Sequence, residues 1–145
     1  MTALELIESL NLLDENEHIE AKRASDAGKS ILDTICAFAN EPGLGGGWLL
    51  LGVREDRALF PAYEVEGIDQ PEKLGAEIAT QCRNTFNQPV RVDITSETIH
   101  GKTVLVVHVP EAQPQDKPIF FKAQGLPKGA LRRISSTDQH CTDDD

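Results

Sequence analysis

Five cationic side chains lie close together near the end of the chain, between positions 117 and 137, where the sequence has no acidic residue. They are Lys117, Lys122, Lys128, Arg132 and Arg133. Cations grouped in this way can bind phosphate groups, so the segment is a candidate nucleic-acid contact. A solvated basic face without a ligand is the alternative that the spacing leaves open.

Further side chains could extend this contact. Phe120 and Phe121 are adjacent, so only one of them can face outward on a strand, where it could stack on a base. The alternative for both rings is a place in the core. Lys22 and Arg23 could also reach phosphates. No recognition helix accompanies these residues, so we expect contacts that are insensitive to base sequence, with specificity residing in further C-terminal domains.

A glycine-rich stretch at positions 43–47 raises the question of nucleotide binding. A P-loop leads from a strand into a helix and ends in Gly-Lys-Ser or Gly-Lys-Thr. Here the predicted order is helix to strand, and Trp48 follows where the lysine would stand. The triplet Gly28-Lys29-Ser30 lacks a preceding glycine loop. We therefore expect no ATP hydrolysis by a P-loop mechanism, and we assign the glycines to a tight reversal with close packing.

Composition narrows the function classes. The net charge of −10 argues against general electrostatic adhesion to nucleic acid. Residues 1–20 contain six acids and no Lys or Arg, so no signal peptide is expected, and no apolar run approaches the roughly 18 residues of a membrane span. Cys36, Cys82 and Cys141 show no metal-site spacing and cannot all pair, which favours a reducing cytoplasm.

The elements that position these residues follow from periodicity and capping. Three helices are predicted. The first covers 2–10 and is capped by Thr2, the second runs from a cap at Ser25 to about position 40, and the third covers 72–86. The unbroken apolar run 48–53 predicts a central strand buried on both faces. Trp48 opens that strand, and we expect it to pack against the helix that carries Ile35 and Phe38.

Strands account for most of the remaining chain. We predict a first strand over 15–23, a hairpin strand within 57–67 that includes Leu59 and Phe60, a hairpin over 90–109, and short strands at 119–123 and 130–134. The fold class is α+β, with a mixed or antiparallel sheet packed against two main helices. A single domain is expected over 1–145. It comprises an N-terminal helix (1–12), a core (13–142), and the start of a truncated or tail segment (143–145).

Several segments, taken together and in order, carry a family resemblance. They are Glu15–Lys22, Cys36–Asn40 with the glycines that follow, Leu50–Asp56, Lys117–Lys122 and Gly129–Asp138. In this order they resemble the Schlafen-type AlbA-like domain, a family formerly described as a divergent AAA domain. The resemblance implies the N-terminal domain of a bacterial transcriptional regulator, followed by winged-helix segments.

The resemblance also points to three carboxylates. In nuclease members of the family, acids at the positions of Glu15, Glu20 and Glu55 hold Mg²⁺ or Mn²⁺ for RNA cleavage. Such hard cations prefer oxygen ligands. Glu15 and Glu20 are five residues apart, so an ordinary strand would place them on opposite faces, and only a bend near Asn16 would bring them together. We expect Glu20 and Glu55 to approach each other while Glu15 stays on a mobile segment before the strand.

The sequence thus predicts a non-catalytic, cytoplasmic domain that binds DNA or RNA through Lys22, Arg23, Lys122, Lys128, Arg132 and Arg133, with no cofactor and no membrane contact. A metal-dependent ribonuclease that uses Glu15, Glu20 and Glu55 is the first alternative. The second is a dimerisation or ligand-sensing module without nucleic-acid contact, and a homodimer is left open.

Overall fold

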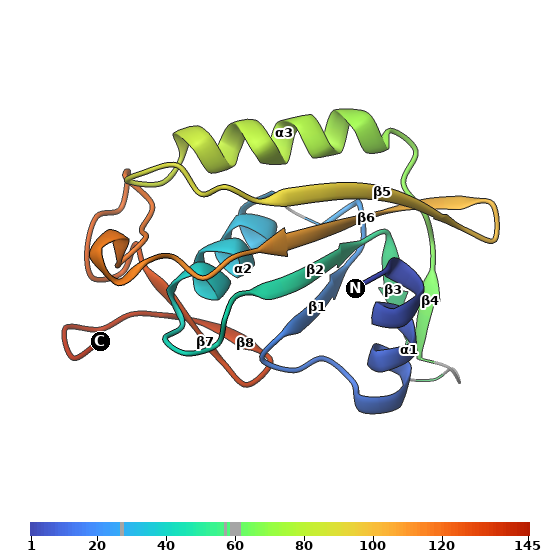
Figure 1. The fold of residues 1–145 in the computed structure, drawn as a ribbon, viewed down its shortest axis with the longest axis horizontal. Coiled ribbons are helices and arrows are strands. Elements are labelled where there is room, and N and C mark those ends of the chain that lie inside the picture. Colours follow the sequence, from blue (N-terminus) through green and yellow to red (C-terminus); the bar gives the residue numbers. More distant parts are fainter. Residues whose placement is uncertain (27, 57, 59–61) are drawn as a thin grey trace.

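The computed structural model describes residues 1–26, 28–56, 58 and 62–145. The elements found there are, in chain order, α1 (Ala3–Leu13), β1 (Ile19–Lys22), α2 (Gly28–Asn40), β2 (Gly47–Leu51), β3 (Val53–Glu55), β4 (Tyr63–Val65), α3 (Pro71–Asn84), β5 (Asp93–Ile99), β6 (Lys102–Val109), the 3-10 helix η1 (Pro114–Asp116), β7 (Leu131–Ile134) and β8 (Thr137–His140). Figure 1 shows that helices and sheets are mixed along the chain, so the predicted α+β class is confirmed.

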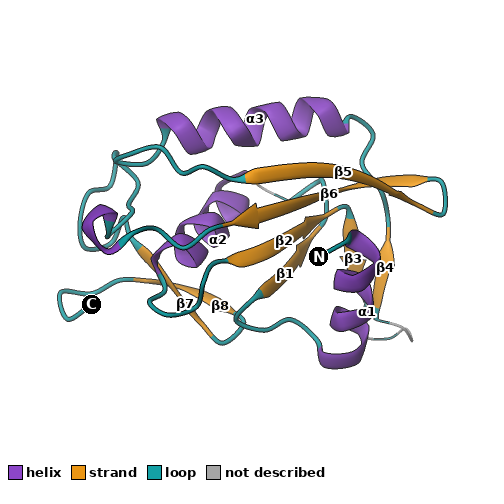
Figure 2. Ribbon diagram, in the orientation of Figure 1, coloured by secondary structure: helices purple, strands orange, loops and turns teal. Residues whose placement is uncertain are grey.

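Four strands form the central sheet in the order β1-β2-β6-β5 (Figure 2). The first pair, β1 and β2, is parallel, while β6 is antiparallel to both of its neighbours, so the sheet is mixed. The parallel pair is connected through α2, because parallel strands need a crossover. Two further antiparallel pairs, β3–β4 and β7–β8, form separate hairpins.

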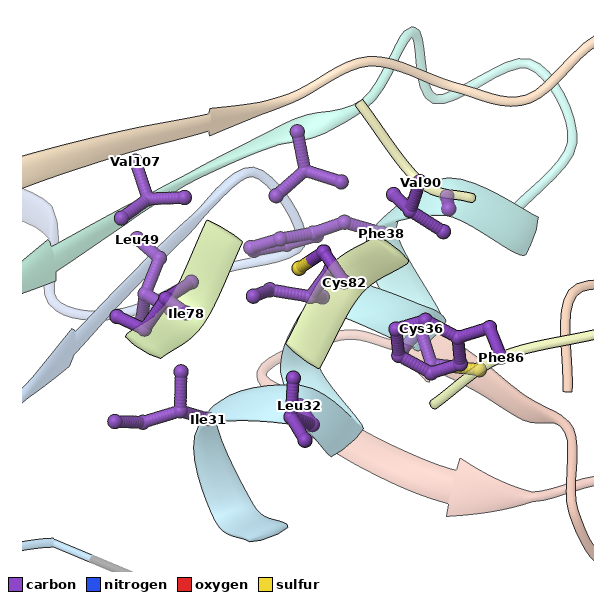
Figure 3. Packing of buried hydrophobic residues seen from close by; sticks show 14 of the residues in the cluster. Ile31, Leu32, Cys36, Phe38, Leu49, Ile78, Cys82, Phe86, Val90 and Val107 are labelled. Carbon is purple, nitrogen blue, oxygen red and sulfur yellow. The ribbon is translucent and has the colours of Figure 1, made fainter. Parts of the chain in front are cut away.

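Apolar side chains cover both faces of the central sheet. On one face α2 and α3 pack against residues such as Leu49 and Val107, and Figure 3 shows these side chains between the two helices and the strands. On the other face α1 packs against residues such as Leu50 and Val106. A strand covered on both sides must be apolar at successive positions, and the run from Leu49 to Leu51 is fully buried. The predicted burial of the central strand is confirmed.

The predicted central strand is interrupted at Gly52. This residue has φ = +99°, a backbone conformation that residues with a Cβ rarely adopt. The chain turns there, and β3 pairs with β4 instead of continuing in the central sheet. The turn determines where Glu55, the last residue of β3, can lie.

Trp48 does not pack against α2, so that prediction is wrong. It is partly exposed, lies on the α1 face of the sheet, and its ring centroid is 4.3 Å from that of His108. The preceding residue faces α2 instead. A Cβ at Gly47 would come within 2.4 Å of the Phe38 ring, so the glycine permits the close approach of the helix. Because side chains alternate between the two faces of a strand, Gly47 faces α2 and the next residue, Trp48, faces α1.

The helix predictions are confirmed where the structure describes them. The Thr2 hydroxyl accepts from the Glu5 amide and the Glu5 carboxylate accepts from the Thr2 amide, which caps α1 from both sides. Pro71 opens α3. The described part of α2 begins at Gly28, beyond the predicted cap Ser25, and the helix ends at Asn40 as predicted.

The second half of the chain was predicted in part. The β5–β6 hairpin with its turn at positions 100–101 is confirmed, and so is β7. Residues 119–123 form no strand; only Phe121 makes an isolated bridge, to Phe86. Strand β8 was not predicted, because its residues are polar. Leu59 and Phe60, assigned to the strand before Tyr63, lie outside the described residues.

Candidate functional site

Two glutamates predicted to lie apart are hydrogen-bonded to each other. The carboxyl of Glu15 bonds with that of Glu20, and the charge of Glu55 acts on Glu15 as well. Glu15 therefore lies with the other two acids, contrary to the expectation that it stays apart from them. The turn at Gly52 contributes to this arrangement, because β3, which ends at Glu55, leaves the sheet next to β1.

The bend that brings Glu15 back is formed by local hydrogen bonds. Asp14 has φ = +67°, and its carboxylate accepts from the Glu15 amide at 2.8 Å and from the Tyr63 hydroxyl. The Asn16 side chain then accepts from the His18 amide at 2.7 Å. Asn and Asp favour such turns because their side chains can replace backbone hydrogen-bond partners. The predicted requirement for a bend near Asn16 is met.

The proximity of the acids changes the protonation of Glu15. Burial raises the pKa of Glu15 to about 9, and the hydrogen bond to Glu20 and the charges of Glu20 and Glu55 act in the same direction, while Arg133 opposes them. Glu15 therefore holds its proton at neutral pH and can donate it in the hydrogen bond to Glu20. Burial raises the pKa of Tyr63, and the hydrogen bond to Asp14 and the charges of Glu15, Glu55 and Asp14 act in the same direction.

Arg133 neutralises this cluster from the interior. The residue is only 2% exposed, and its guanidinium lies 4.9 Å from the centre of the Phe38 ring. Its Nη2 is 3.3 Å from a carboxylate oxygen of Glu20, and its Nη1 is 2.9 Å from one of Asp138. Arg133 is thus a buried structural cation, and this position denies it the predicted surface contact with phosphate.

Lys22 is a second cation on Glu20. Its Nζ lies 3.4 Å from a Glu20 oxygen and donates to the Ser30 hydroxyl at 2.9 Å. The ammonium is largely covered, with 12% of the side chain exposed. Glu20 therefore has a cation on each of its two oxygens, and Lys22 faces the cluster rather than solvent.

The donor chemistry of Glu15, Glu20 and Glu55 suits a hard divalent cation, but other positive charge already neutralises the cluster. Glu15 holds a proton, and Glu20 is neutralised by Lys22 and Arg133. Among the residues that the structure describes, no group of three or more His, Cys, Asp or Glu side chains is placed to hold a metal ion. A metal would have to displace both the proton and the existing ion pairs.

Two of the predicted phosphate-binding arginines lie at the surface but are paired. Arg23 is 2.9 Å from a Glu66 oxygen. Arg132 contacts Glu41 at 3.0 Å and Asp145 at 2.8 Å, and these acids raise its pKa further. Each of these charges is therefore compensated locally.

Lys122 and Lys128 differ from the other predicted cations. Both are exposed, and neither has an acidic partner within residues 1–26, 28–56, 58 and 62–145. They lie on the segment between η1 and β7, which gathers at one end of the molecule in Figure 1. Of the six predicted nucleic-acid contacts, these two present uncompensated charge to solvent.

Asparagines that the sequence prediction did not single out hold this segment. Asn40, the buried last residue of α2, donates to the carbonyls of Ile119 (2.8 Å) and Leu131 (3.0 Å) and accepts from the Ile119 amide (2.7 Å). Asn87 accepts from the Phe120 amide at 2.8 Å. A polar residue ending an apolar helix face is a signal that could have identified Asn40, because buried amides are hydrogen-bonded.

The glycine-rich turn binds an internal carboxylate. The amides of Gly43 and Gly45 donate to the two oxygens of Glu111, at 3.3 and 2.8 Å, and Lys117 lies 2.6 Å from the same carboxylate. A Cβ at Gly46 would come within 2.0 Å of the Val109 carbonyl oxygen, so the predicted close packing is present. Lys117 is consequently paired, and the turn runs from helix to strand as predicted.

The chain belongs to the Schlafen AlbA_2 family, whose model matches residues 15–142. It is 49% identical to the N-terminal domain of a RecG-related protein from Nitrosomonas europaea, named for an ATP-dependent DNA helicase. That solution NMR structure superimposes with a TM-score of 0.81 over 98% of this chain and 94% of the other.

A more distant structure shows the same fold. A protein of Corynebacterium diphtheriae, solved by crystallography, is 17% identical, with a TM-score of 0.59 over 94% of this chain. The match covers 26% of that protein, so this chain spans about a quarter of its length. No curated protein matches the sequence. Within the described residues, no helix has the length and apolar character needed to cross a membrane.

Proposed function

We propose that this chain is a nucleic-acid-binding domain of a bacterial transcriptional regulator and that it contacts phosphates through exposed lysines between η1 and β7. Family membership and the similarity to a domain of a RecG-related protein support an association with nucleic acid. The regulator role rests on the domain order that the family resemblance implies.

The uncompensated charge of Lys122 and Lys128 is the observation that carries the proposal. A protein with a net charge of −10 repels a polyanion at long range, so binding requires cations that are not neutralised by their neighbours. Two phosphate contacts to duplex DNA would give a salt dependence with a log–log slope of about −2. Such contacts carry no base information, so the binding is insensitive to sequence.

The test compares two double variants that each remove two positive charges. Lys122→Ala with Lys128→Ala should weaken binding to unrelated sequences equally, and each lysine should account for about 1 unit of the salt slope. The matched control is Lys73→Ala with Lys102→Ala. These two exposed lysines lie at the other end of the molecule, at the start of α3 and beside the β5–β6 turn (Figure 1).

The readout is fluorescence anisotropy of labelled oligonucleotides across a salt titration, after circular dichroism has shown that each variant is folded. We expect the control variant to bind like the wild type. Equal affinity and an equal salt slope for all three proteins would overturn the proposal, because the charge at positions 122 and 128 would then not contribute to binding.

A metal-dependent ribonuclease is the second candidate, favoured by the convergence of Glu15 and Glu20 close to Glu55. Its test is incubation of the folded protein with transfer RNA and Mn²⁺. Cleavage that Glu20→Gln abolishes, while the exposed-site control Glu8→Gln retains it, would support the nuclease. If the RNA stays intact after incubation with Mn²⁺ in excess over the protein, the nuclease proposal fails and nucleic-acid binding remains as the proposed function.

A further inference from the structure

Phe120 is a partly accessible aromatic residue whose two sequence neighbours are buried. Ile119 and Phe121 are buried at 2% and 6% exposure, while Phe120 is half-buried and Lys122 is exposed. The Phe121 ring packs 4.9 Å from the Phe86 ring and 4.9 Å beneath the Lys29 ammonium. Phe121 thus belongs to the core, whereas its two sequence neighbours, the Phe120 ring and the Lys122 ammonium (unpaired among the described residues), both keep surface exposed to solvent.

The backbone that carries Phe120 is fixed from both sides. Asn87 accepts from the Phe120 amide (2.8 Å), its own amide donates to the Phe120 carbonyl (2.9 Å), and its side chain donates to the Pro118 carbonyl (3.3 Å). The Lys122 amide donates to the Thr85 carbonyl at 3.1 Å. A ring held in this way has little backbone freedom to lose on binding, which favours affinity.

From this placement we infer that the segment selects unpaired nucleic acid, with a base stacked on Phe120 and the neighbouring phosphates on Lys122 and Lys128. The inference rests on the proposed function and names its substrate class. A base in a duplex is already stacked and paired, so it cannot present its face to a surface ring, whereas a base in a single strand can. Single-stranded DNA and RNA share this chemistry.

The test measures binding to a mixed-sequence oligonucleotide of about 12 nucleotides, within the usual site size of such surfaces, as single-stranded DNA, as single-stranded RNA and as duplex DNA. Phe120→Leu removes the ring but keeps an apolar side chain. It should weaken binding to both single strands about fivefold or more and leave duplex binding unchanged, because stacking on an aromatic ring is lost. Phe120→Trp keeps a stacking ring and should retain single-strand affinity.

Leu126→Ala is the matched control, because Leu126 is exposed on the same segment but has no ring. It should bind all three ligands like the wild type. Unchanged single-strand affinity of Phe120→Leu, or an equal loss for single strand and duplex, would overturn this inference while leaving the proposed function standing. If the wild type binds neither form, both fail. A loss for one single strand only assigns the site to DNA or to RNA.

Discussion

The carboxylate cluster around Arg133 and the basic segment around Lys122 contain similar side chains in opposite settings. In the cluster, Glu20 is bound by two cations and Arg133 is buried. On the segment, Lys122 and Lys128 face solvent without an acidic partner in the described chain. The first region uses charge to join β1, β7 and β8, and the second has charge available for a ligand.

This difference shows that a run of like charges in a sequence does not by itself define a binding surface. Arg132 and Arg133 are adjacent to each other and near Lys128, yet one is paired at the surface and the other lies in the core. In a strand, neighbours point to opposite sides, so two adjacent arginines cannot share one role. The partners of each charge, which are distant in sequence, decide its function.

The largest expected effect comes from breaking the buried cluster. Arg133→Met should lower the free energy of unfolding by about 3–5 kcal/mol, because it leaves the carboxylates of Glu20 and Asp138 without their buried cation. Arg23→Met is the matched control, since its pair with Glu66 is exposed and should contribute little. Urea denaturation measures both. Equal unfolding midpoints for Arg133→Met and wild type would show that the cluster is not a stabilising element.

A smaller effect separates the adjacent phenylalanines by stability. Phe121→Leu should cost about 1 kcal/mol or more, because the aromatic pair with Phe86 contributes about 0.5–1.5 kcal/mol beyond simple burial. Phe120→Leu should cost less, since its ring is only half-buried. Thermal unfolding followed by circular dichroism compares the two. A larger loss for Phe120→Leu would reverse the assignment of which ring belongs to the core.

A separate prediction is a pH dependence of stability that originates at Glu15. The pKa of Glu15 is raised from its ordinary value of 4.5 to about 9 in the folded state, so the folded protein binds the proton more tightly than the unfolded chain. The resulting stability is fully present below about pH 4.5 and is lost as the pH rises through the folded-state pKa near 9. Glu15→Gln, which cannot ionise, should therefore gain stability relative to the wild type as the pH rises.

Urea denaturation at a series of pH values measures this difference. Glu8→Gln, a substitution on the exposed side of α1, is the control, and its offset from the wild type should not change with pH. A Glu15→Gln offset that stays constant across the same range would contradict the shared proton between Glu15 and Glu20.

Local patterns were sufficient to predict α1, α3 and the β5–β6 hairpin. Each has a periodic apolar face together with a cap, a proline or a glycine turn that acts over a few residues. The burial of the central strand was also predictable, since every residue from Leu49 to Leu51 is apolar. The face occupied by Trp48 was not, because it depends on whether the strand begins at Gly47 or one residue later.

The candidate sites depended on contacts that spacing cannot reveal. Glu15 reaches Glu20 only because Asp14, Asn16 and Tyr63 bend the chain, and Tyr63 is far away in sequence. Arg133 is buried because Asp138 and Glu20 are both present to pair with it. Strand β8, which supplies Asp138, is polar and gave no periodic signal. The sequence predicts that only one of Phe120 and Phe121 faces outward. It does not predict which one, because that depends on the packing of Phe121 against Phe86 and on the hydrogen bonds of Asn87 to Phe120.

The central claim is that nucleic acid contacts the Lys122 segment and not the carboxylate cluster. The most direct measurement is a titration of ¹⁵N-labelled protein with a short single-stranded oligonucleotide, followed by amide chemical shifts. The account predicts shifts concentrated at residues 119–129 and at Asn87, with the amides of residues 15–22 and 53–55 unchanged. Shifts concentrated at 15–22 and 53–55, with residues 119–129 unaffected, would contradict it.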